Sequence, residues 1–389
     1  MQTPDLLILG GGYAGVAAAL RARRRLGPGA RLTLVSDRDH LVERVRLHEA
    51  AARGRPVLRP LADLLRGTGV RWVHARAERL DPGGRLRTDA GDLAFGALIV
   101  AIGSRPDPGR LEGLAEHGEV LDHRGARRIG PRLGALPEGA RVLVVGGGLT
   151  GIEAASEVAA AHPRLRVQLA TRGSLGERTT ARQRERLHRS LARLGVEVLE
   201  GTPVARLSAG AAHHGGGALP FDLCVFAGGF RPPALLAEAG LAVDPDGRAP
   251  VPPTLRAAPD ALVWLAGDCA AVRGSPGSPV VTGCKTALPM GGHAADNAAR
   301  VLQGRPERPF AWRDNGRLMS LGRRDGIFQG MTVEGEPSGV TLGGWPAAWL
   351  KEQVNRFSLG ALAWERRAPF PFPWPTARRK VHVLPAEAS

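Results

Sequence analysis

Near its N-terminus this 389-residue chain reads Asp5-Leu-Leu-Ile-Leu9-Gly10-Gly-Gly-Tyr-Ala-Gly15, and an alanine-rich segment follows as far as Leu26. The apolar run predicts a strand, and the segment after the glycines predicts a helix. In a G-x-G-x-x-G turn of this kind the first glycine permits the tight turn, the second lets the backbone approach a pyrophosphate, and the third lets helix and strand pack closely. The phosphates lie at the helix N-terminus. One such motif is weak evidence here, because 53 of the residues are glycine.

The same unit occurs a second time in the chain. Val142-Leu-Val-Val145 precedes Gly146-Gly-Gly-Leu-Thr-Gly151, and a helical pattern follows over residues 152–161. Each copy is followed by a strand that ends in A-x-G-x-R-P, at residues 101–106 and 227–232. A third strand ends in Ala266-Gly-Asp268, where a carboxylate can accept hydrogen bonds from a polyol chain. The repeat predicts an α/β fold with two Rossmann-like dinucleotide-binding domains.

The composition is that of a soluble globular enzyme. Hydrophobic residues make up 43% of the chain and charged residues 23%. The longest run without a charge, residues 6–20, is shorter than the roughly 20 residues that a membrane-spanning helix needs. Met1 leads into an apolar strand without the features of a secretory signal. The three cysteines, Cys224, Cys269 and Cys284, form no C-x-x-C, so we expect buried thiols. These features predict a cytoplasmic enzyme of two or three domains.

The formal net charge of +16 raises the question of nucleic-acid binding. All but three of the 53 basic residues are arginine, and no consecutive basic run is longer than Arg23-Arg24-Arg25. They are scattered along a chain that also holds 53 glycines and 31 prolines. This indicates a compositional bias, and we expect no specific nucleic-acid partner.

The order of these motifs over about residues 5 to 335 resembles the two-dinucleotide-binding flavoprotein family. Within that family the chain looks most like type II NADH dehydrogenases and the apoptosis-inducing-factor-like oxidoreductases. The narrower resemblance lies in Arg46-Leu-His-Glu-Ala-Ala51, in Ala266-Gly-Asp268 and in Gly316-Arg-Leu-Met-Ser-Leu-Gly-Arg323. It implies an FAD-binding domain in two parts, an NAD(P)H-binding domain inserted between them, and a small α+β C-terminal region. The corresponding ranges are 1–108 and 233–315 for FAD, 109–232 for NAD(P)H, and 316–389 for the C-terminal region.

The resemblance assigns the first glycine motif and the A-G-D phrase to FAD. The family usually places an acidic residue directly at the end of the second strand, to bind the FAD ribose. Here Ser36 stands at that point and Asp37 follows it. Three alternatives follow. Asp37 binds the FAD ribose from one position further along the chain, or Ser36 contacts the ribose through its hydroxyl group, or Asp37 is a solvated carboxylate in a loop. The expected FAD contacts are Gly10, Gly12, Gly15, Ser36, Asp37, Ala101, Gly103, Gly267, Asp268 and Ala287.

The resemblance assigns the second glycine motif to the nicotinamide dinucleotide. An acidic residue after its second strand would bind the ribose of NADH, but Thr171-Arg172 stands there. Arg172 and Arg178 have a spacing that resembles the arginine pair of NADPH-specific disulfide reductases. Guanidinium suits a phosphate because its planar donors bind bidentately. This favours NADPH and leaves NADH open. The expected contacts are Gly146, Gly148, Gly151, Glu153, Thr171, Arg172, Arg178 and Gly229.

The expected electron acceptor is a quinone or a quinone-like molecule. Residues 1–223 contain no cysteine, which argues against the thiol relay of disulfide reductases. Type II dehydrogenases carry an A-Q-x-x-x-Q pattern at their quinone site. This chain has Ala287-Leu-Pro-Met-Gly-Gly292 there, without either glutamine. We therefore expect a smaller or less polar acceptor pocket than that of a respiratory enzyme.

Two segments are expected to contact the flavin or the acceptor. Arg46, His48 and Glu49 belong to a segment that the resemblance places beside the flavin ring, together with Arg44. Lys285, with Thr286, is expected beside the acceptor pocket, where its charge would stabilise a reduced flavin or quinone. The four candidates for the catalytic role are Arg46, His48, Glu49 and Lys285.

No metal site is expected. His48-Glu49 opens an H-E-x-x-H pattern, but Ala52 stands where the second histidine would be. The pair His213-His214 lies in a Gly/Ala-rich stretch that predicts a hairpin loop.

The C-terminal region, residues 345–389, combines tryptophan and phenylalanine with basic residues. Such a segment fits a peripheral contact with the inner face of the cell membrane. Glu352, Gln353 and Asn355 interrupt an apolar face over residues 345–364, and prolines from Pro369 onward forbid a helix after it. Packing across the flavin site, and a homodimer seam, are the alternatives.

Together these features predict an FAD-dependent NAD(P)H dehydrogenase. It would pass a hydride from NAD(P)H to FAD and then electrons to a quinone or quinone-like acceptor. A reductase of a small electron-transfer protein or of a pathway-specific metabolite is the first alternative. A nucleic-acid-binding or scaffold flavoprotein is the second.

Overall fold

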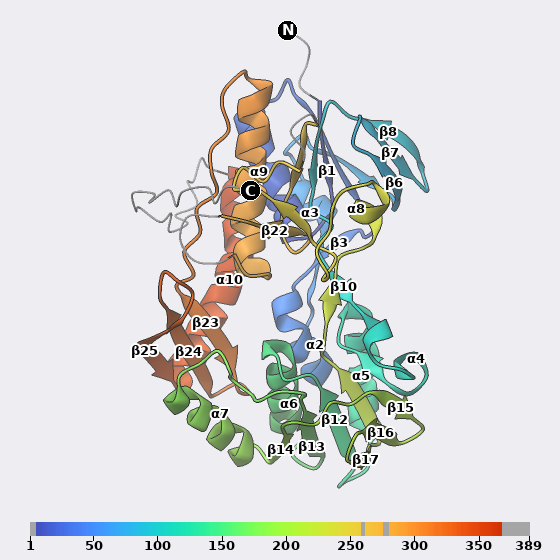
Figure 1. Cartoon of the computed structure of the whole chain (residues 1–389), viewed down its shortest axis with the longest axis vertical. Helices are drawn as coiled ribbons and strands as arrows, with labels where there is room; N and C mark the ends of the chain where they lie inside the picture. Colours follow the sequence, from blue (N-terminus) through green and yellow to red (C-terminus); the bar gives the residue numbers. More distant parts are fainter. Residues whose placement is uncertain (1–4, 258–260, 275–279, 368–389) are drawn as a thin grey trace, which may run out of the picture.

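Two α/β domains lie one above the other, and a long C-terminal helix runs beside them (Figure 1). The computed structural model describes residues 5–257, 261–274 and 280–367. The upper domain is built on a five-stranded parallel sheet with the order β21-β9-β1-β2-β5. Its strands are β21 (Val263–Leu265), β9 (Ala97–Val100), β1 (Asp5–Leu9), β2 (Arg31–Ser36) and β5 (Arg71–His74).

The lower domain repeats this sheet. Its order is β11-β18-β12-β13-β14, again parallel, with β18 and β13 flanking β12 as β9 and β2 flank β1. The strands are β11 (Glu119–Val120), β18 (Leu223–Phe226), β12 (Arg141–Val145), β13 (Arg166–Ala170) and β14 (Val196–Leu199). Side chains of β1 and β12 are buried on both faces, as in parallel sheets covered by helices. The expected pair of Rossmann-like domains is confirmed.

The two domains are joined where the A-x-G-x-R-P phrases meet. The short strand β10 (Arg105–Pro106) pairs antiparallel with β19 (Phe230–Arg231), so that Arg105 lies opposite Arg231. Each domain also carries a three-stranded antiparallel sheet. These are β6 (Ala77–Asp81), β7 (Arg85–Thr88) and β8 (Gly91–Ala94) above, and β15 (Arg206–Ser208), β16 (Ala211–His214) and β17 (Gly217–Pro220) below. The histidine pair, expected in a hairpin loop, therefore lies on strand β16 of a hairpin.

Helices cover both sheets. In the upper domain α1 (Tyr13–Leu26) packs tightly against α9 (Cys284–Leu302), and a Cβ on Gly291 would lie 2.0 Å from the carbonyl oxygen of Ala14. Below lie α6 (Leu149–Ala161), α5 (His123–Ala135) and α7 (Ala181–Arg193). Helix α2 (Leu47–Arg53) descends from the upper domain and packs on α5 and α6. The shorter elements are β3 (His40–Val42), η1 (Arg44–Arg46), β4 (Leu58–Pro60), α3 (Leu61–Leu65), η2 (Pro108–Arg110), α4 (Leu114–His117), α8 (Leu235–Glu238), β20 (Ala249–Val251) and β22 (Ala270–Val272).

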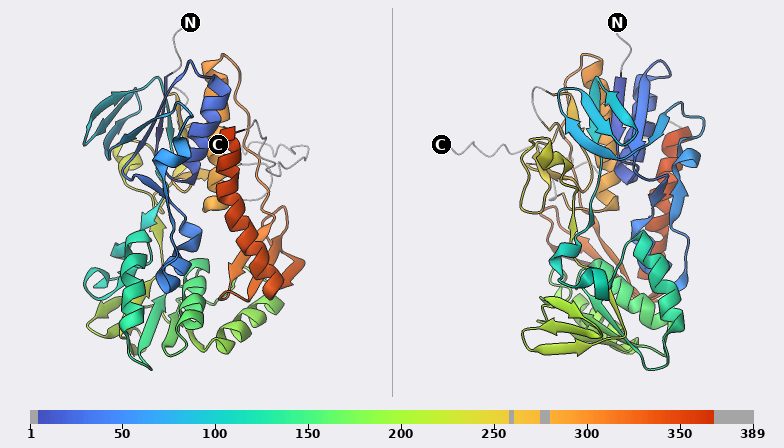
Figure 2. Two further views of the ribbon diagram at one scale, coloured as in Figure 1. Left: turned by 180° about the vertical axis from the view of Figure 1, so that it is seen from behind. Right: turned by 90° about the vertical axis from the view of Figure 1, so that its right-hand side faces the viewer.

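The C-terminal region is a small α+β unit that spans both domains. Strands β23 (Gly316–Ser320), β24 (Gly326–Met331) and β25 (Pro337–Gly343) form an antiparallel sheet beside the lower domain. Helix α10 (Trp345–Arg367) then runs back up to α1 (Figure 2). The prolines from Pro369 onward lie outside the described residues.

Candidate functional site

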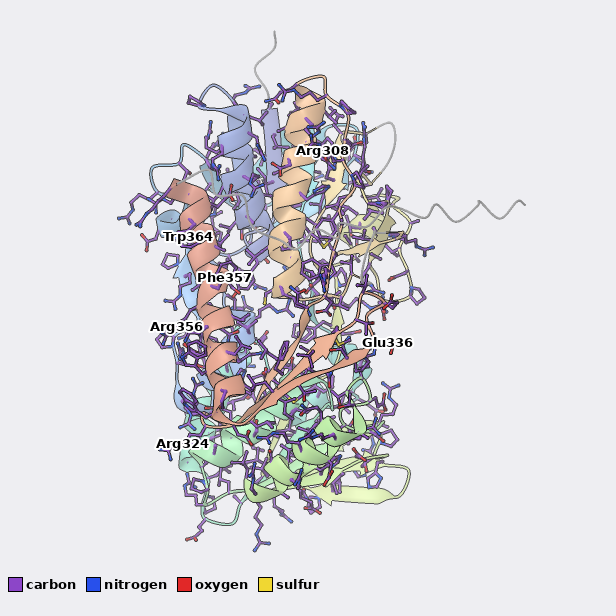
Figure 3. The ribbon with its side chains drawn as sticks, turned by 90° about the vertical axis from the view of Figure 1, so that its left-hand side faces the viewer. Arg308, Arg324, Glu336, Arg356, Phe357 and Trp364 are labelled. Carbon is purple, nitrogen blue, oxygen red and sulfur yellow. The ribbon has the colours of Figure 1, made fainter. Side chains whose placement is uncertain are left out.

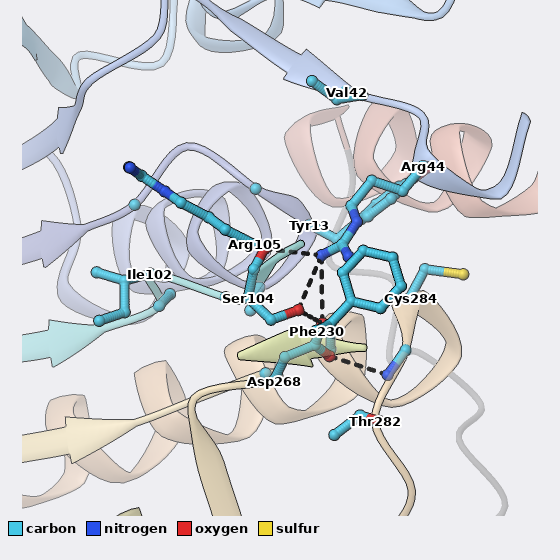
Figure 4. A pocket seen from close by; sticks show the side chains of 18 of the residues that line it. Tyr13, Val42, Arg44, Ile102, Ser104, Arg105, Phe230, Asp268, Thr282 and Cys284 are labelled. Carbon is cyan, nitrogen blue, oxygen red and sulfur yellow. Dashed lines mark hydrogen bonds and ion pairs between the residues drawn. The ribbon is translucent and has the colours of Figure 1, made fainter. Parts of the chain in front are cut away.

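A cavity of about 1240 Å³ lies between the two domains and α10. Its wall includes the first glycine turn at Gly10 and Gly12, the start of α6 at Leu149, and Lys351 and Asn355 of α10. Figure 4 shows part of this wall from close by. The cavity therefore joins the first dinucleotide turn to the helix that follows the second.

The glycine turns have the shape that a dinucleotide requires. Gly10 has φ +119°, and a Cβ there would lie 2.2 Å from the carbonyl oxygen of Ala101. A Cβ on Gly15 would lie 1.8 Å from the carbonyl oxygen of Gly10. A Cβ on Gly12 would meet nothing within 4 Å, so this position faces open space at the N-terminus of α1. An open backbone face at a helix N-terminus fits a pyrophosphate.

The second turn repeats this geometry. Gly146 has φ +129°, a Cβ on Gly151 would lie 1.8 Å from the carbonyl oxygen of Gly146, and a Cβ on Gly148 would again meet nothing within 4 Å. The residues present therefore fit two dinucleotides, one at each turn.

Ser36 and Asp37 both line the large cavity. Ser36 is buried, and its hydroxyl accepts a hydrogen bond from the backbone N–H of Arg38 at 3.2 Å. Asp37 forms an ion pair with Arg105. Ala101, Gly103, Gly267 and Ala287 line the same cavity.

Asp268 lies where the A-G-D phrase predicts, at the end of β21 and on the cavity wall (Figure 4). Its carboxylate accepts hydrogen bonds from Ser104 Oγ at 2.7 Å, from the Gly283 N–H at 2.9 Å and from Arg44 at 3.4 Å. The Arg44 guanidinium stacks over Phe230, 4.5 Å from its ring centroid. Arg44 thereby links the upper domain to β19, the strand at the crossing between the two domains.

Lys285 also lines the cavity, at the start of α9. Its Nζ donates to Asp314 Oδ1 at 2.6 Å and to the carbonyl oxygen of Gly316 at 3.1 Å. Thr286 does not line the cavity, and its hydroxyl donates to the carbonyl oxygens of Val281 and Gly283 just before α9.

A buried charged cluster closes the lower end of the cavity. Glu153 of α6 accepts a hydrogen bond from the Ser320 N–H at 3.0 Å, and its Oε1 lies 2.9 Å from Lys351 Nζ. His48 Nδ1 lies 3.7 Å from the other oxygen of Glu153. Burial alone would raise the pKa of Glu153, but Lys351, His48 and Ser320 outweigh it and lower that pKa. Burial lowers the pKa of His48, although Glu153 opposes the shift. The cluster therefore holds an ionised glutamate beside a lysine and a neutral imidazole.

Arg46 and Glu49 do not line the cavity, in contrast to the expected contact with flavin or acceptor. Arg46 is buried and turned away from the cavity, and its guanidinium pairs with Glu352 of α10 at 2.7 Å, Glu49 at 3.0 Å and Glu43 at 3.3 Å. The ion cluster of Glu43, Arg46, Glu49 and Glu352 ties α2 to α10. Arg46 and Glu49 are three residues apart and share one face of the segment, whereas His48 lies on another face. For this reason His48 lines the cavity and the other two do not.

A second cavity of about 240 Å³ lies at the second glycine turn. Gly148, Arg178 and Arg317 line it. Thr171 is buried behind the turn, and Arg172 is exposed beside it. Gly229 lines neither cavity; it lies at the crossing between the domains, against Arg110.

Sequence reasoning missed several residues on the cavity walls. Lys351 was grouped with the basic residues of the C-terminal region, although its type was a signal, because the chain contains only three lysines. Cys284, expected to be a buried thiol, is half-buried on the wall of the large cavity, whereas Cys224 and Cys269 are buried. Burial raises the pKa of each of these last two to about 12. Ser104 lies within the A-x-G-x-R-P phrase and Arg317 within the phrase Gly316 to Arg323, but neither was expected to line the site.

The outer face of α10 is aromatic. Trp345, Trp349, Phe357 and Trp364 are 63%, 52%, 43% and 52% exposed. Figure 3 shows Phe357 and Trp364 along this face, with Arg356. Glu352 pairs with Arg46 and Asn355 is buried, so the polar residues that interrupt the apolar pattern face inward. The inner face of the helix contacts the buried ion cluster at Glu352 and the apolar core of the upper domain at Leu362.

Two classes of feature are not found in the described part of the chain. No helix there is long and apolar enough to cross a bilayer. Among the same residues, no group of three or more His, Cys, Asp or Glu side chains is placed to hold a metal ion. His213 instead bonds Ser208 Oγ at 2.7 Å.

Known proteins resemble the chain over most of its length. It is 31% identical over 377 residues to an NADH dehydrogenase-like protein of Mycobacterium tuberculosis, covering 90% of this chain and 92% of that protein. It is 25% identical over 399 residues to the type II NADH:quinone oxidoreductase of Staphylococcus saprophyticus, covering 92% and 96%. The solved structure of NDH2 from Plasmodium falciparum in complex with NADH has the same fold, with a TM-score of 0.73 at 15% identity, covering 94% of this chain and 99% of that one. Residues 4–297 match the family model of the pyridine nucleotide-disulphide oxidoreductases. This protein belongs to the pyridine nucleotide-disulphide oxidoreductase family.

Proposed function

We propose that the protein is an FAD-dependent NAD(P)H:quinone oxidoreductase. The observation that carries this function is the large cavity, which reaches from the first dinucleotide turn to the helix of the second and ends at the pair of Lys351 and the buried Glu153. The relatives named as NADH dehydrogenase-like and type II NADH:quinone oxidoreductase support it. In the overall reaction NAD(P)H, a proton and a quinone become NAD(P)⁺ and the quinol.

The residues of the upper domain would hold the FAD. Gly10, Gly12 and Gly15 form the turn for its pyrophosphate, and Asp268 accepts hydrogen bonds from hydroxyl groups. Ser36 and Asp37 stand at the end of β2, where a ribose binds in such domains. When bound, FAD takes a hydride from the reduced nicotinamide and gives two electrons to the quinone.

The lower end of the cavity supplies the proton. Lys351 Nζ can donate to a quinone oxygen, and Glu153 Oε1 lies 2.9 Å from the same Nζ. The neutral His48 packs against the same glutamate, so that the two residues fix the position of Lys351. Lys285 adds a second positive charge to the cavity wall, where it favours a negatively charged reduced group.

The acceptor end of the cavity lacks the two glutamines that type II dehydrogenases carry at their quinone site. The A-L-P-M-G-G segment lies inside α9, where Gly291 packs on Ala14 and Ala287 lines the wall. Both glutamines of the type II pattern are absent, so the polar groups that α10 offers to a quinone are Lys351 and the amide of Asn355.

We further propose that the aromatic face of α10 contacts a membrane surface at the inner side of the cell. Three tryptophans and a phenylalanine on one helix, with Arg356, Arg366 and Arg367 nearby, have the composition of an interfacial helix. This helix also lines the cavity, so that docking would bring the acceptor end close to lipid-soluble quinones. A second copy of the chain is the alternative occupant of this face.

The test is the reduction of bound FAD by NAD(P)H and its reoxidation by a quinone, followed separately without oxygen. Reduction without reoxidation by quinone, but with reoxidation by a ferredoxin, would instead support a reductase of an electron-transfer protein.

A further inference from the structure

The large cavity and the small cavity at the second glycine turn have two lining residues in common. Leu149 and Arg317 line both of them. Leu149 is the first residue of α6, directly after Gly148 of the turn, and Arg317 lies on β23 of the C-terminal sheet. The boundary between the two cavities is therefore formed by the lower domain and by the C-terminal region together.

One face of the C-terminal sheet forms a wall of the small cavity. Arg317 of β23 lies opposite Gln329 of β24, and two residues further along β23 Met319 lies opposite Ile327. Both pairs line the small cavity, as expected for residues two apart on paired strands, which share one face of a sheet. The Arg317 side chain therefore belongs to the face of the sheet that covers the second glycine turn.

The backbone on both sides of Arg317 is held by the two lysines of the large cavity. Lys285 Nζ donates to the carbonyl oxygen of Gly316 at 3.1 Å. Lys351 Nζ donates to the carbonyl oxygen of Leu318 at 3.2 Å. Because both neighbouring carbonyl groups are bonded in this way, the position of Arg317 is fixed relative to the wall of the large cavity.

The charge of Arg317 has no partner in the protein. Over the residues that the structure describes, its guanidinium makes neither an ion pair nor a hydrogen bond. Glu177 is the acid on the wall of the small cavity, and its carboxylate accepts the Ser174 N–H at 2.9 Å. Leu149, the other residue at the boundary, is 43% exposed. An unpaired cation and an exposed leucine at one boundary fit a ligand that passes from one cavity into the other and carries negative charge there.

A nicotinamide dinucleotide has this distribution of charge. Its adenosine half belongs at the second glycine turn, whereas its nicotinamide ring has to reach the flavin in the large cavity. The pyrophosphate joins the two halves and carries negative charge at the middle of the molecule. A guanidinium group suits it because planar donors can bind a phosphate bidentately.

We propose that Arg317 binds the pyrophosphate of NAD(P)H where the dinucleotide passes from the small cavity into the large one. The contact is with the phosphate next to the nicotinamide ribose, so that Arg317 positions the nicotinamide ring for hydride transfer. The nucleotide site is then incomplete without the C-terminal sheet, although no residue of that region is among the nucleotide contacts expected from the sequence. The inference rests on the proposed function for the identity of the ligand.

The first experiment measures binding and needs no turnover. ADP-ribose, which contains the pyrophosphate, and 5′-AMP, which contains only the adenosine-side phosphate, are titrated calorimetrically into the FAD-loaded protein. Arg317→Ala should weaken the binding of ADP-ribose by about 10-fold, the size of a charge-assisted hydrogen bond, and that of 5′-AMP by less than about 3-fold. Arg317→Lys, which keeps the charge without the planar donors, should recover part of the affinity.

The matched control for this titration is Arg324→Ala. Arg324 is an exposed arginine in the turn between β23 and β24, and it lines neither cavity. This variant should bind both ligands as the unchanged protein does. Unchanged affinity for ADP-ribose in Arg317→Ala, or an equal loss for both ligands, would overturn the inference.

The second experiment compares two hydride donors, NAD(P)H and 1-benzyl-1,4-dihydronicotinamide, which has no phosphate. Without oxygen, Arg317→Ala should raise the NAD(P)H concentration that gives half-maximal flavin reduction by about 10-fold, and reduction by the benzyl compound should keep its rate. Equal slowing with both donors would show an effect on the flavin and overturn the inference, leaving the proposed function intact. Binding of ADP-ribose that depends on Arg317, in a protein whose flavin NAD(P)H does not reduce, would support the site and contradict the proposed function.

Discussion

Lys351 Nζ lies 2.9 Å from Glu153 Oε1, which joins the C-terminal helix to the nicotinamide domain at the wall of the large cavity. Lys351→Met keeps the length of the side chain and removes its charge. Reoxidation of the reduced flavin by a quinone should slow by about 100-fold, the usual contribution of a positioned general acid. Stopped-flow absorbance without oxygen measures this step. Ferricyanide, which takes electrons without a proton, should reoxidise the variant at the unchanged rate, and equal slowing with both acceptors would contradict a proton role.

A substitution at Gly12, the second glycine of the first G-x-G-x-x-G motif, should affect cofactor binding without affecting the fold. Gly12→Ala should leave the fold intact, because its Cβ meets nothing within 4 Å, and should weaken FAD binding by about 10-fold or more because the methyl group stands where the pyrophosphate approaches. Fluorescence titration of the apoprotein with FAD measures the affinity. Gly29→Ala is the control, since a Cβ there also meets nothing. Unchanged FAD affinity in Gly12→Ala would place the cofactor elsewhere.

The buried ion cluster around Arg46 contributes stability. Arg46→Ala removes the shared cation from Glu43, Glu49 and Glu352 and should lower the free energy of unfolding by about 1 to 3 kcal/mol. The loss stays in this range because the three carboxylates keep Arg59, Arg55 and Arg356 as partners. Arg356→Ala removes an exposed cation from the same Glu352 and should cost less than about 1 kcal/mol. Urea denaturation compares the two. If Arg46→Ala unfolded at the same urea concentration as the unchanged protein and lost turnover, the residue would belong to the catalytic machinery after all.

The pH dependence of stability should report the buried His48. Its pKa is lowered by burial, so the folded state binds its proton less readily than the unfolded state, whose histidine pKa is about 6.5. The stability that this group contributes is present above that value and is lost as the pH falls through it. Burial also lowers the pKa of His123, to about 4, and of His293. His48→Gln should therefore reduce the loss of stability below about pH 6.5 by about 1.4 kcal/mol per pH unit. Urea titrations between pH 5 and 7.5 measure the slope, and an unchanged slope would show that His48 is protonated in the folded state.

The aromatic face of α10 should bind lipid surfaces. Trp349→Ser and Trp364→Ser should each lower partition onto anionic vesicles by about 10-fold, since a large apolar side chain contributes about 1.5 to 3 kcal/mol on burial. Vesicle sedimentation measures this, with Val243→Ser of the upper domain as the exposed apolar control. If neither tryptophan mattered for partition and both disrupted a dimer in analytical ultracentrifugation, the face would be an interface between two copies of the chain.

The repeated part of the fold could be predicted from the sequence. The strands before both glycine turns, the helices after them and the A-G-D strand end lie where the pattern predicts, because glycine turns of this kind constrain the backbone locally. The structure adds two features that the sequence did not indicate. The strand order is the same in both parallel sheets, and Arg105 pairs with Arg231 between the domains. That pairing joins residues far apart in sequence, so no local pattern indicates it.

The candidate site was predicted less completely. Five of the predicted glycines, Asp268 and Lys285 lie on the cavity walls, the glycines being Gly10, Gly12, Gly103, Gly148 and Gly267. The segment 44–49, in contrast, divides between two environments. Arg44 and His48 face the cavity, whereas Arg46 and Glu49 face α10. The sequence cannot indicate this division, because it depends on the position of a helix some 300 residues later in the chain. The contact of the same helix with a membrane surface stays a prediction.

The most direct test of the central claim is a stepwise titration of the FAD-loaded protein under nitrogen, followed by visible absorbance. The account predicts that NADPH bleaches the flavin with a stoichiometry of about one per FAD, and that a soluble quinone then restores the colour with release of one quinol. If neither NADPH nor NADH bleached the bound flavin, or if the reduced flavin kept its state in the presence of quinone, the protein would not be an NAD(P)H:quinone oxidoreductase.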